Sequence, residues 1–150
     1  MIRSAQPKGI LLSVPAILLS GVALAHAPVC TAWPVHAVVT FIVGTLLTLS
    51  AFASLAGNFA VLPAVRGVTT SGVYRMVRHP AYLGEILLVV ACCSAQVDLP
   101  ALATLFMTIA AVVVRIRAEE SLLNATDISS SQRYQSYQAA VTYRLFPGLW

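Results

Sequence analysis

Four long apolar stretches separate the few charged residues of this chain, and they constrain its fold more than any other feature. They cover residues 9–27, 35–57, 81–97 and 99–116. A helix needs roughly 17–25 apolar residues to cross a bilayer, so each stretch is long enough to span one. Only 9% of the 150 residues are charged, against about 25% in a typical soluble domain. We therefore predict an all-α integral membrane protein, a single domain over residues 1–150 with about four transmembrane helices.

Several other classes of protein are excluded by the same sequence. It contains no glycine-rich phosphate-binding motif and no alternation of strand-like with helix-like segments. Nine basic and five acidic residues give a net charge of +4. Because the basic residues are spread among apolar stretches, no nucleic-acid partner is predicted. Cys30, Cys92 and Cys93 lack the spacing of metal ligands. We expect them to pack as small hydrophobic residues, and we predict no metal site.

The basic residues also predict the orientation of the chain. Every Lys and Arg lies before the first apolar stretch, between the second and third, or at and beyond the end of the fourth. Because cytoplasmic segments carry the excess of Lys and Arg, both termini and the central loop are predicted to face the cytoplasm. The first stretch follows Arg3 and Lys8 and contains Ala23-Leu24-Ala25, so it also resembles a cleavable secretory signal. Cleavage would leave the other three spans in the same orientation.

The third and fourth stretches are predicted to form a tight antiparallel hairpin. Only Asp98-Leu99-Pro100 lies between them, and both Asp and Pro favour the start of a helix. His79 and Glu119 each lie twenty residues from Leu99, one on either side. Two antiparallel helices with the same rise per residue place these positions at the same depth. The hairpin therefore brings two polar clusters, residues 74–85 and 115–120, together at the cytoplasmic boundary.

Local chemistry indicates what such a site can bind. His79 precedes Pro80, so it should end a loop while Pro80 starts a helix whose free N–H groups suit a carboxylate or a phosphate. Gly84 permits the close approach of a ligand or of a neighbouring helix. Two acidic residues at the end of the fourth span can be neutralised by Arg115 and Arg117. Alternatively, these residues form no binding site. In that case the arginines only anchor the membrane topology, and the acidic residues form a solvated helix end.

The C-terminal segment, residues 124–150, changes in character and is predicted to be cytoplasmic or interfacial. Residues 124–132 are polar and are predicted to form a loop. Within them, Ser129 and Gln132 are predicted to form the capping box of a short helix that runs to about Val141. Tyr134, Tyr137 and Val141 share one face of that helix. It is either an interfacial helix with aromatic residues at headgroup level or a lid over the cytoplasmic site.

At these residues the chain resembles the isoprenylcysteine carboxyl methyltransferase family, in particular its short bacterial members, and the related phospholipid methyltransferases. The pattern runs Arg78-His79-Pro80-Ala81-Tyr82-Leu83-Gly84 and then Arg117-Ala118-Glu119-Glu120-Ser121-Leu122-Leu123. It continues through Tyr134, Tyr137 and residues 141–147. The resemblance covers about residues 58–150, and the two motifs together are specific, whereas either alone would be weak.

The resemblance implies a multi-pass enzyme, in a bacterial cytoplasmic membrane, that binds S-adenosylmethionine from the cytoplasm. It implies a lipophilic acceptor that enters from the bilayer, with membrane lipids around the protein. The catalytic residues would be Arg117 and Glu120. The cofactor would be bound by Arg78, His79, Pro80, Tyr82, Leu83, Gly84, Glu119 and Glu120. The chain departs from the family pattern at Ala139-Ala140, where a basic residue is usual, and Arg144 is the nearest substitute.

Three points stay open on the sequence alone. The acceptor can be a carboxylate, a thiol or an amine, since direct displacement of a methyl group from a sulfonium imposes no single acceptor. The chain can instead be a non-enzymatic membrane subunit whose charged loops dock a partner. A weaker alternative is a haem or quinone protein that uses His26 and His36, although both are predicted on the outer side.

Overall fold

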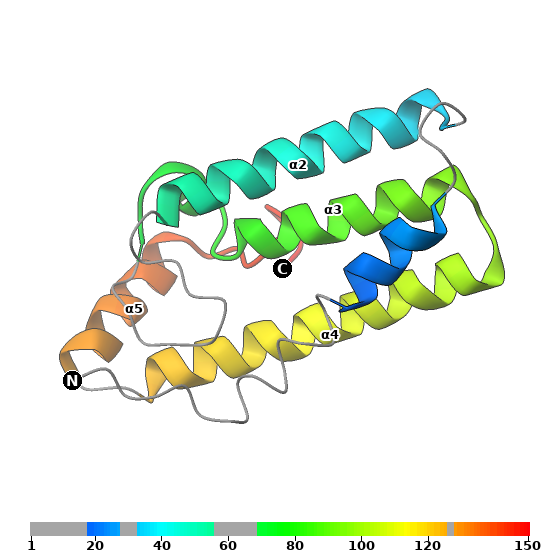
Figure 1. Ribbon diagram of the computed structural model, residues 1–150. Helices are drawn as coiled ribbons and strands as arrows, with labels where there is room; N and C mark the ends of the chain where they lie inside the picture. Colours follow the sequence, from blue (N-terminus) through cyan, green and yellow to red (C-terminus); the bar gives the residue numbers. More distant parts are fainter. Residues whose placement is uncertain (1–17, 28–32, 56–68, 126–127) are drawn as a thin grey trace.

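The chain folds into helices around one antiparallel hairpin (Figure 1). The computed structural model describes residues 18–27, 33–55, 69–125 and 128–150. These residues form helices and connecting segments and contain no strand. The helices are residues 18–26, α2 (Val35–Leu55), η3 (Gly72–Arg75), α3 (Pro80–Ala95), α4 (Leu99–Asn124) and α5 (Ile128–Ala140). The all-α prediction is confirmed for the described part.

The prediction of four spans is corrected to two for the described residues. Only α2, with 21 residues, and α4, with 26, are long and apolar enough to cross a membrane. Helix α3 has 16 residues and so rises about 24 Å, less than the roughly 30 Å of a hydrocarbon core. Its length is limited by Pro80 at one end and by the turn before α4 at the other. Of the first predicted span, residues 9–17 lie outside the described residues, and residues 18–26 are helical.

The surfaces of α2 and α4 are unusually apolar. Large hydrophobic side chains on both are exposed, among them Leu46 at 59% on α2 and Phe106 at 75% on α4. A soluble protein would not present so much contiguous apolar surface to water. These faces are suited to lipid, which agrees with the predicted membrane environment.

Helix α2 packs on α3 through small residues. Ala37, Gly44 and Ala51, every seventh residue of α2, are its buried positions. A Cβ added at Gly84 of α3 would lie 3.0 Å from the Gly44 carbonyl oxygen and would also collide with the side chain of Thr48. Two helices approach this closely only where side chains are absent, as is common in membranes. Of the two roles that the sequence left open for Gly84, the structure uses it for helix packing.

The α3–α4 hairpin forms as predicted from Asp98 and Pro100. Asp98 is the N-cap residue of α4, and its Oδ1 accepts a hydrogen bond of 2.8 Å from the Ala101 N–H. Helix α4 then continues to Asn124, eight residues beyond the predicted end of its apolar stretch, because the charged residues 115–120 remain helical. This extension carries Glu119 and Glu120 past the apolar part of the hairpin to the level of the start of α3.

The last ten residues, 141–150, form what we call the C-terminal strap. It leaves α5 and returns to the hairpin end that lies away from residues 96–98 (Figure 1). Leu145 of the strap is buried against Ile86 of α3 and Val112 and Ile116 of α4. The strap is thus part of the core, and it places its polar groups beside the ends of α3 and α4.

Candidate active site

The loop before α3 is fixed by the C-terminal strap. His79 is the N-cap residue of α3 and has φ −128° and ψ 58°, outside the helical region, as expected for a residue before proline. The N–H groups of Arg78 and His79 donate to the carbonyl oxygens of Tyr143 and Arg144, both at 2.9 Å. These bonds satisfy two backbone N–H donors just before the start of α3, and they fix the loop so that both side chains point toward α4.

Glu120 is the charged centre of the site, and two arginines and one histidine surround its buried carboxylate. Arg78 Nε and His79 Nε2 lie 3.2 and 3.3 Å from Oε1. Arg144 Nε and Nη2 lie 2.9 and 2.8 Å from Oε2. Arg78 Nη1 also donates to the Val141 carbonyl oxygen at 3.4 Å. One carboxylate of α4 therefore joins the loop before α3 to the strap.

Glu119 makes a second, separate contact with α3. The Tyr82 hydroxyl donates to Glu119 Oε2 at 2.8 Å. The Arg115 guanidinium lies over the Tyr82 ring, 4.9 Å from its centroid, and the His79 ring stacks on Tyr82 with centroids 5.6 Å apart. Among the described residues, no cation lies within ion-pair distance of Glu119. The two neighbouring carboxylates thus differ, because Glu120 is surrounded by cations and Glu119 is held by a neutral hydroxyl.

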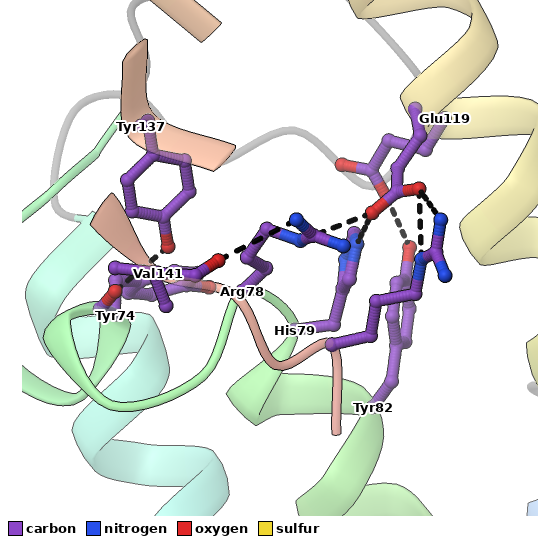
Figure 2. Close-up of polar contacts among 9 residues, drawn as sticks. Tyr74, Arg78, His79, Tyr82, Glu119, Tyr137 and Val141 are labelled. Atoms are coloured by element: carbon purple, nitrogen blue, oxygen red, sulfur yellow. Dashed lines mark hydrogen bonds and ion pairs between the residues drawn. The ribbon is translucent and has the colours of Figure 1, made fainter. Parts of the chain in front are cut away.

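Helix α5 is attached to the other side of this loop. The Tyr137 hydroxyl donates to the Tyr74 carbonyl oxygen at 2.7 Å (Figure 2). Tyr134, Tyr137 and Val141 form a small buried cluster, so the aromatic face predicted for this helix is directed inward. Burial raises the pKa of Tyr137 to about 12 and keeps its hydroxyl protonated as a donor.

A comparison of the chain with models of known protein families gives one match. A model of the isoprenylcysteine carboxyl methyltransferase family matches residues 35–125, more than half of the chain. The chain belongs to this family. The family is one of membrane methyltransferases, and the matched region contains α2, α3, α4 and every site residue on them. No curated protein matches the chain at a significant level.

Within this methyltransferase domain, the structure gathers most of the residues that the sequence proposed. Arg78, His79 and Tyr82 meet Glu119 and Glu120 as described above. Pro80 is fully buried at the start of α3, and Leu83 packs against the core around Ile86 and Val112. The side chains of both support the site through packing, and the Leu83 N–H also donates to the His79 carbonyl oxygen at 3.1 Å.

Two predicted residues lie apart from this cluster. Gly84 faces α2 rather than α4. Arg117 is exposed, and the described residues include no partner for its guanidinium. Arg115, two residues earlier and therefore on the opposite face of α4, is buried and lies over Tyr82. The role that the resemblance implied for Arg117 therefore stays a prediction, and the geometry favours Arg115 for a place in the site.

Sequence reasoning missed the contact between Arg144 and Glu120. It noted Arg144 only as a substitute for a missing basic residue near Val141. The two residues are 24 positions apart and meet because the strap turns back along the hairpin. No local pattern in residues 141–150 predicts that path. The buried Leu145, which anchors the strap, is one apolar residue in a short irregular segment.

Tyr134 supplies a polar group that the described protein leaves unsatisfied. Its side chain is 2% exposed, and its hydroxyl is buried with no hydrogen-bond partner. Gln138, one turn further on, lies close to it but not in hydrogen-bonding geometry. Burial raises the pKa of Tyr134, and the nearby negative charge of Glu120 raises it further. Buried donors are nearly always paired, so this hydroxyl is a candidate to pair with a ligand oxygen or nitrogen.

The opposite end of the hairpin contains a small cavity of about 140 Å³. It is lined by His26, Cys92, Cys93 and Asp98 among others. His26 is exposed, and its Nδ1 lies 2.9 Å from the Val22 carbonyl oxygen. In the part of the chain that the structure describes, no group of three or more His, Cys, Asp or Glu residues is placed to hold a metal ion.

Proposed function

We propose that this protein transfers a methyl group from S-adenosylmethionine to a lipophilic acceptor at the site formed by α3, α4 and the strap. One observation carries the proposal. The start of α3 and the end of α4 bring Arg78, His79 and Tyr82 against Glu119 and Glu120 in a largely buried cluster. Buried charge is costly, and it persists in a chain this apolar where it serves binding or chemistry.

The donor set suits the two charged ends of this cofactor. Arginine and histidine near the N–H groups at the start of α3 can bind its carboxylate, and Arg78 is the best placed of them. The carboxylates of Glu119 and Glu120 can bind its ammonium group. The Tyr134 hydroxyl is one of several buried polar atoms without a hydrogen-bond partner among the described residues, and a ligand can pair with it. The carboxylate and the ammonium group of the cofactor thus each have a matching group on the protein.

When bound, S-adenosylmethionine supplies an activated methyl group on a sulfonium, which a nucleophile takes up by direct displacement. The protein then needs to align two reactants and to exclude water. Tyr82 is held by two neighbours, since the His79 ring stacks on its ring and the Arg115 guanidinium lies over it. This rigid stack provides the fixed wall that alignment requires.

We further propose that the acceptor reaches the site from the bilayer. The exposed apolar faces of α2 and α4 support a position of these helices in lipid, with the polar cluster at the membrane boundary. An acceptor with a hydrocarbon tail and a polar head can lie along the hairpin with its head at the cluster. A carboxylate or thiolate acceptor needs no base, whereas an amine would need a group to take its proton.

A labelled-methyl transfer assay tests this function. Membranes that contain the protein are incubated with S-adenosylmethionine carrying a labelled methyl group, and lipid-soluble products are identified by mass spectrometry. We expect a labelled lipophilic product that disappears with His79→Ala. Membranes with Arg133→Gln, which changes an exposed residue of α5, serve as the matched control. A wild-type protein that transfers no label but co-purifies with another protein would instead favour the docking alternative.

A further inference from the structure

Arg144 differs in its exposure and contacts from Arg78 and His79, the other two side chains around Glu120. Its side chain is 32% exposed, whereas those of Arg78 and His79 are 7% and 6% exposed. Arg78 also donates from its side chain to Val141, which ties it into the fold. The remaining contact of the Arg144 guanidinium is with the Trp150 ring, whose centroid is 5.2 Å away.

Both oxygens of the Glu120 carboxylate already face polar side chains. His79 Nε2 lies within hydrogen-bond distance of Oε1, and Arg78 Nε forms an ion pair with the same oxygen at 3.2 Å. On the other oxygen, Oε2, Arg144 donates a hydrogen bond from Nε and forms an ion pair through Nη2. A ligand ammonium group that approaches Oε2 would therefore compete with the Arg144 guanidinium for the same negative charge.

We propose that the Arg144 guanidinium occupies a cation site on Glu120 Oε2, and that the ammonium group of the ligand displaces it. This inference rests on the proposed function. It adds that Arg144 competes with the ammonium group of the ligand for Glu120. Arg144 is the cation that can leave, because it is already partly in water and its departure buries no unpaired charge. Leaving by Arg78 would strand a guanidinium in a nearly closed site.

The exchange is a side-chain movement, and the strap itself stays in place. Leu145, next to Arg144, is 3% exposed in the core, and the Tyr143 and Arg144 carbonyl oxygens still accept from the loop before α3. The environment of the Trp150 ring should change when Arg144 moves, because the guanidinium that lies over the ring leaves it. Ligand binding at Glu120 is thus coupled to the surroundings of one tryptophan.

The first arm of the test measures affinity for S-adenosylhomocysteine by calorimetry on the purified full chain. Removal of an internal competitor raises the fraction of binding-competent protein, so Arg144→Gln should bind roughly fivefold more tightly or better. Arg144→Lys, which keeps a competing cation, should stay close to wild type. Arg133→Gln removes one positive charge elsewhere and should change nothing. The probe 5′-methylthioadenosine, which lacks the ammonium group, should bind all variants equally.

The second arm uses the fluorescence of Trp150. The chain has two tryptophans, so Trp33→Phe leaves Trp150 as the only one. S-adenosylhomocysteine should change its emission, and 5′-methylthioadenosine should not. Unchanged or weaker affinity of Arg144→Gln, together with unchanged Trp150 emission, would overturn the inference and would place the ammonium group elsewhere, such as at Glu119. A wild-type protein with no affinity for either probe would instead contradict the proposed function itself.

Discussion

In the folded chain, Nε2 of His79 lies 3.3 Å from Oε1 of Glu120, although 41 positions separate the two residues. The contact joins the first residue before α3 to the last turns of α4. It exists because the hairpin turn at Asp98 sets the two helices level, and because α4 continues far enough to present Glu120. The stability of this end of the protein depends on the charge that Glu120 carries.

Neighbouring substitutions in α4 should therefore differ sharply in their effect on stability. Glu120→Gln removes the anion between Arg78, His79 and Arg144, and loss of one partner from a buried ion pair costs about 3–5 kcal/mol. Glu119→Gln keeps an acceptor for the Tyr82 hydroxyl and should cost about 1 kcal/mol or less. Thermal unfolding in detergent, followed by circular dichroism, compares the two. Equal losses would show that Glu120 is not the charged centre of the site.

Because α2 lies so close to α3, the addition of a single methyl group at Gly84 should lower the stability of the protein. Gly84→Ala places a Cβ against the Gly44 carbonyl oxygen and Thr48, and overpacking of this kind costs about 1–3 kcal/mol. Gly21→Ala is the matched control, because a Cβ there meets nothing within 4 Å. That control should be neutral or slightly stabilising. If both variants melted at the same temperature, the packing of α2 on Gly84 would be wrong.

The hydrogen bond from Tyr137 to the Tyr74 carbonyl predicts a loss of stability at alkaline pH. The pKa of Tyr137 is raised by burial from 10.0 to about 12, so folding favours the protonated form. The stabilisation from this group is complete below pH 10 and is lost as the pH rises to about 12. Tyr137→Phe should be less stable than wild type by about 1 kcal/mol at neutral pH.

The difference between wild type and Tyr137→Phe should narrow between pH 10 and pH 12. Unfolding midpoints of both proteins across that range provide the measurement. A gap that stays constant would mean that the Tyr137 hydroxyl does not titrate in this window.

The two arginines near the end of α4 should differ in their effect on ligand binding. Arg115 is buried with its guanidinium over Tyr82, and a desolvated cation–π contact is worth about 1–2 kcal/mol. Arg115→Ala should lower affinity for S-adenosylmethionine about tenfold, whereas the exposed Arg117→Ala should leave it nearly unchanged. Calorimetry on the two purified variants decides between them. A larger effect of Arg117→Ala would restore the catalytic role that the family resemblance implied for that residue.

Much of the site was predictable because it depends on counting along one hairpin. Asp98 and Pro100 indicate where α4 begins, and equal distances from Leu99 then bring His79 to the level of Glu119. The observed partner of His79 is Glu120, one residue away, because side chains project from a helix at angles that counting does not resolve. Tyr82 contacts Glu119 instead.

Other features depend on packing that a sequence does not encode locally. The strap reaches Glu120 only because Leu145 fits between α3 and α4, and this fit depends on three helices at once. A span was predicted at α3 because its sequence is mostly apolar, yet the flanking turns limit the helix to 16 residues. Hydropathy reports how apolar a segment is, and not where its helix ends.

The central claim is that S-adenosylmethionine binds where α3, α4 and the strap meet. Its most direct test is calorimetric titration of S-adenosylmethionine into the detergent-purified protein, the His79→Ala and Glu120→Gln variants, and the Arg133→Gln control, all with helix content checked beforehand. We predict binding to the wild type and to the control, weakened by about tenfold or more in both site variants. No detectable binding to the wild type, or an affinity unchanged in both site variants, would contradict the claim.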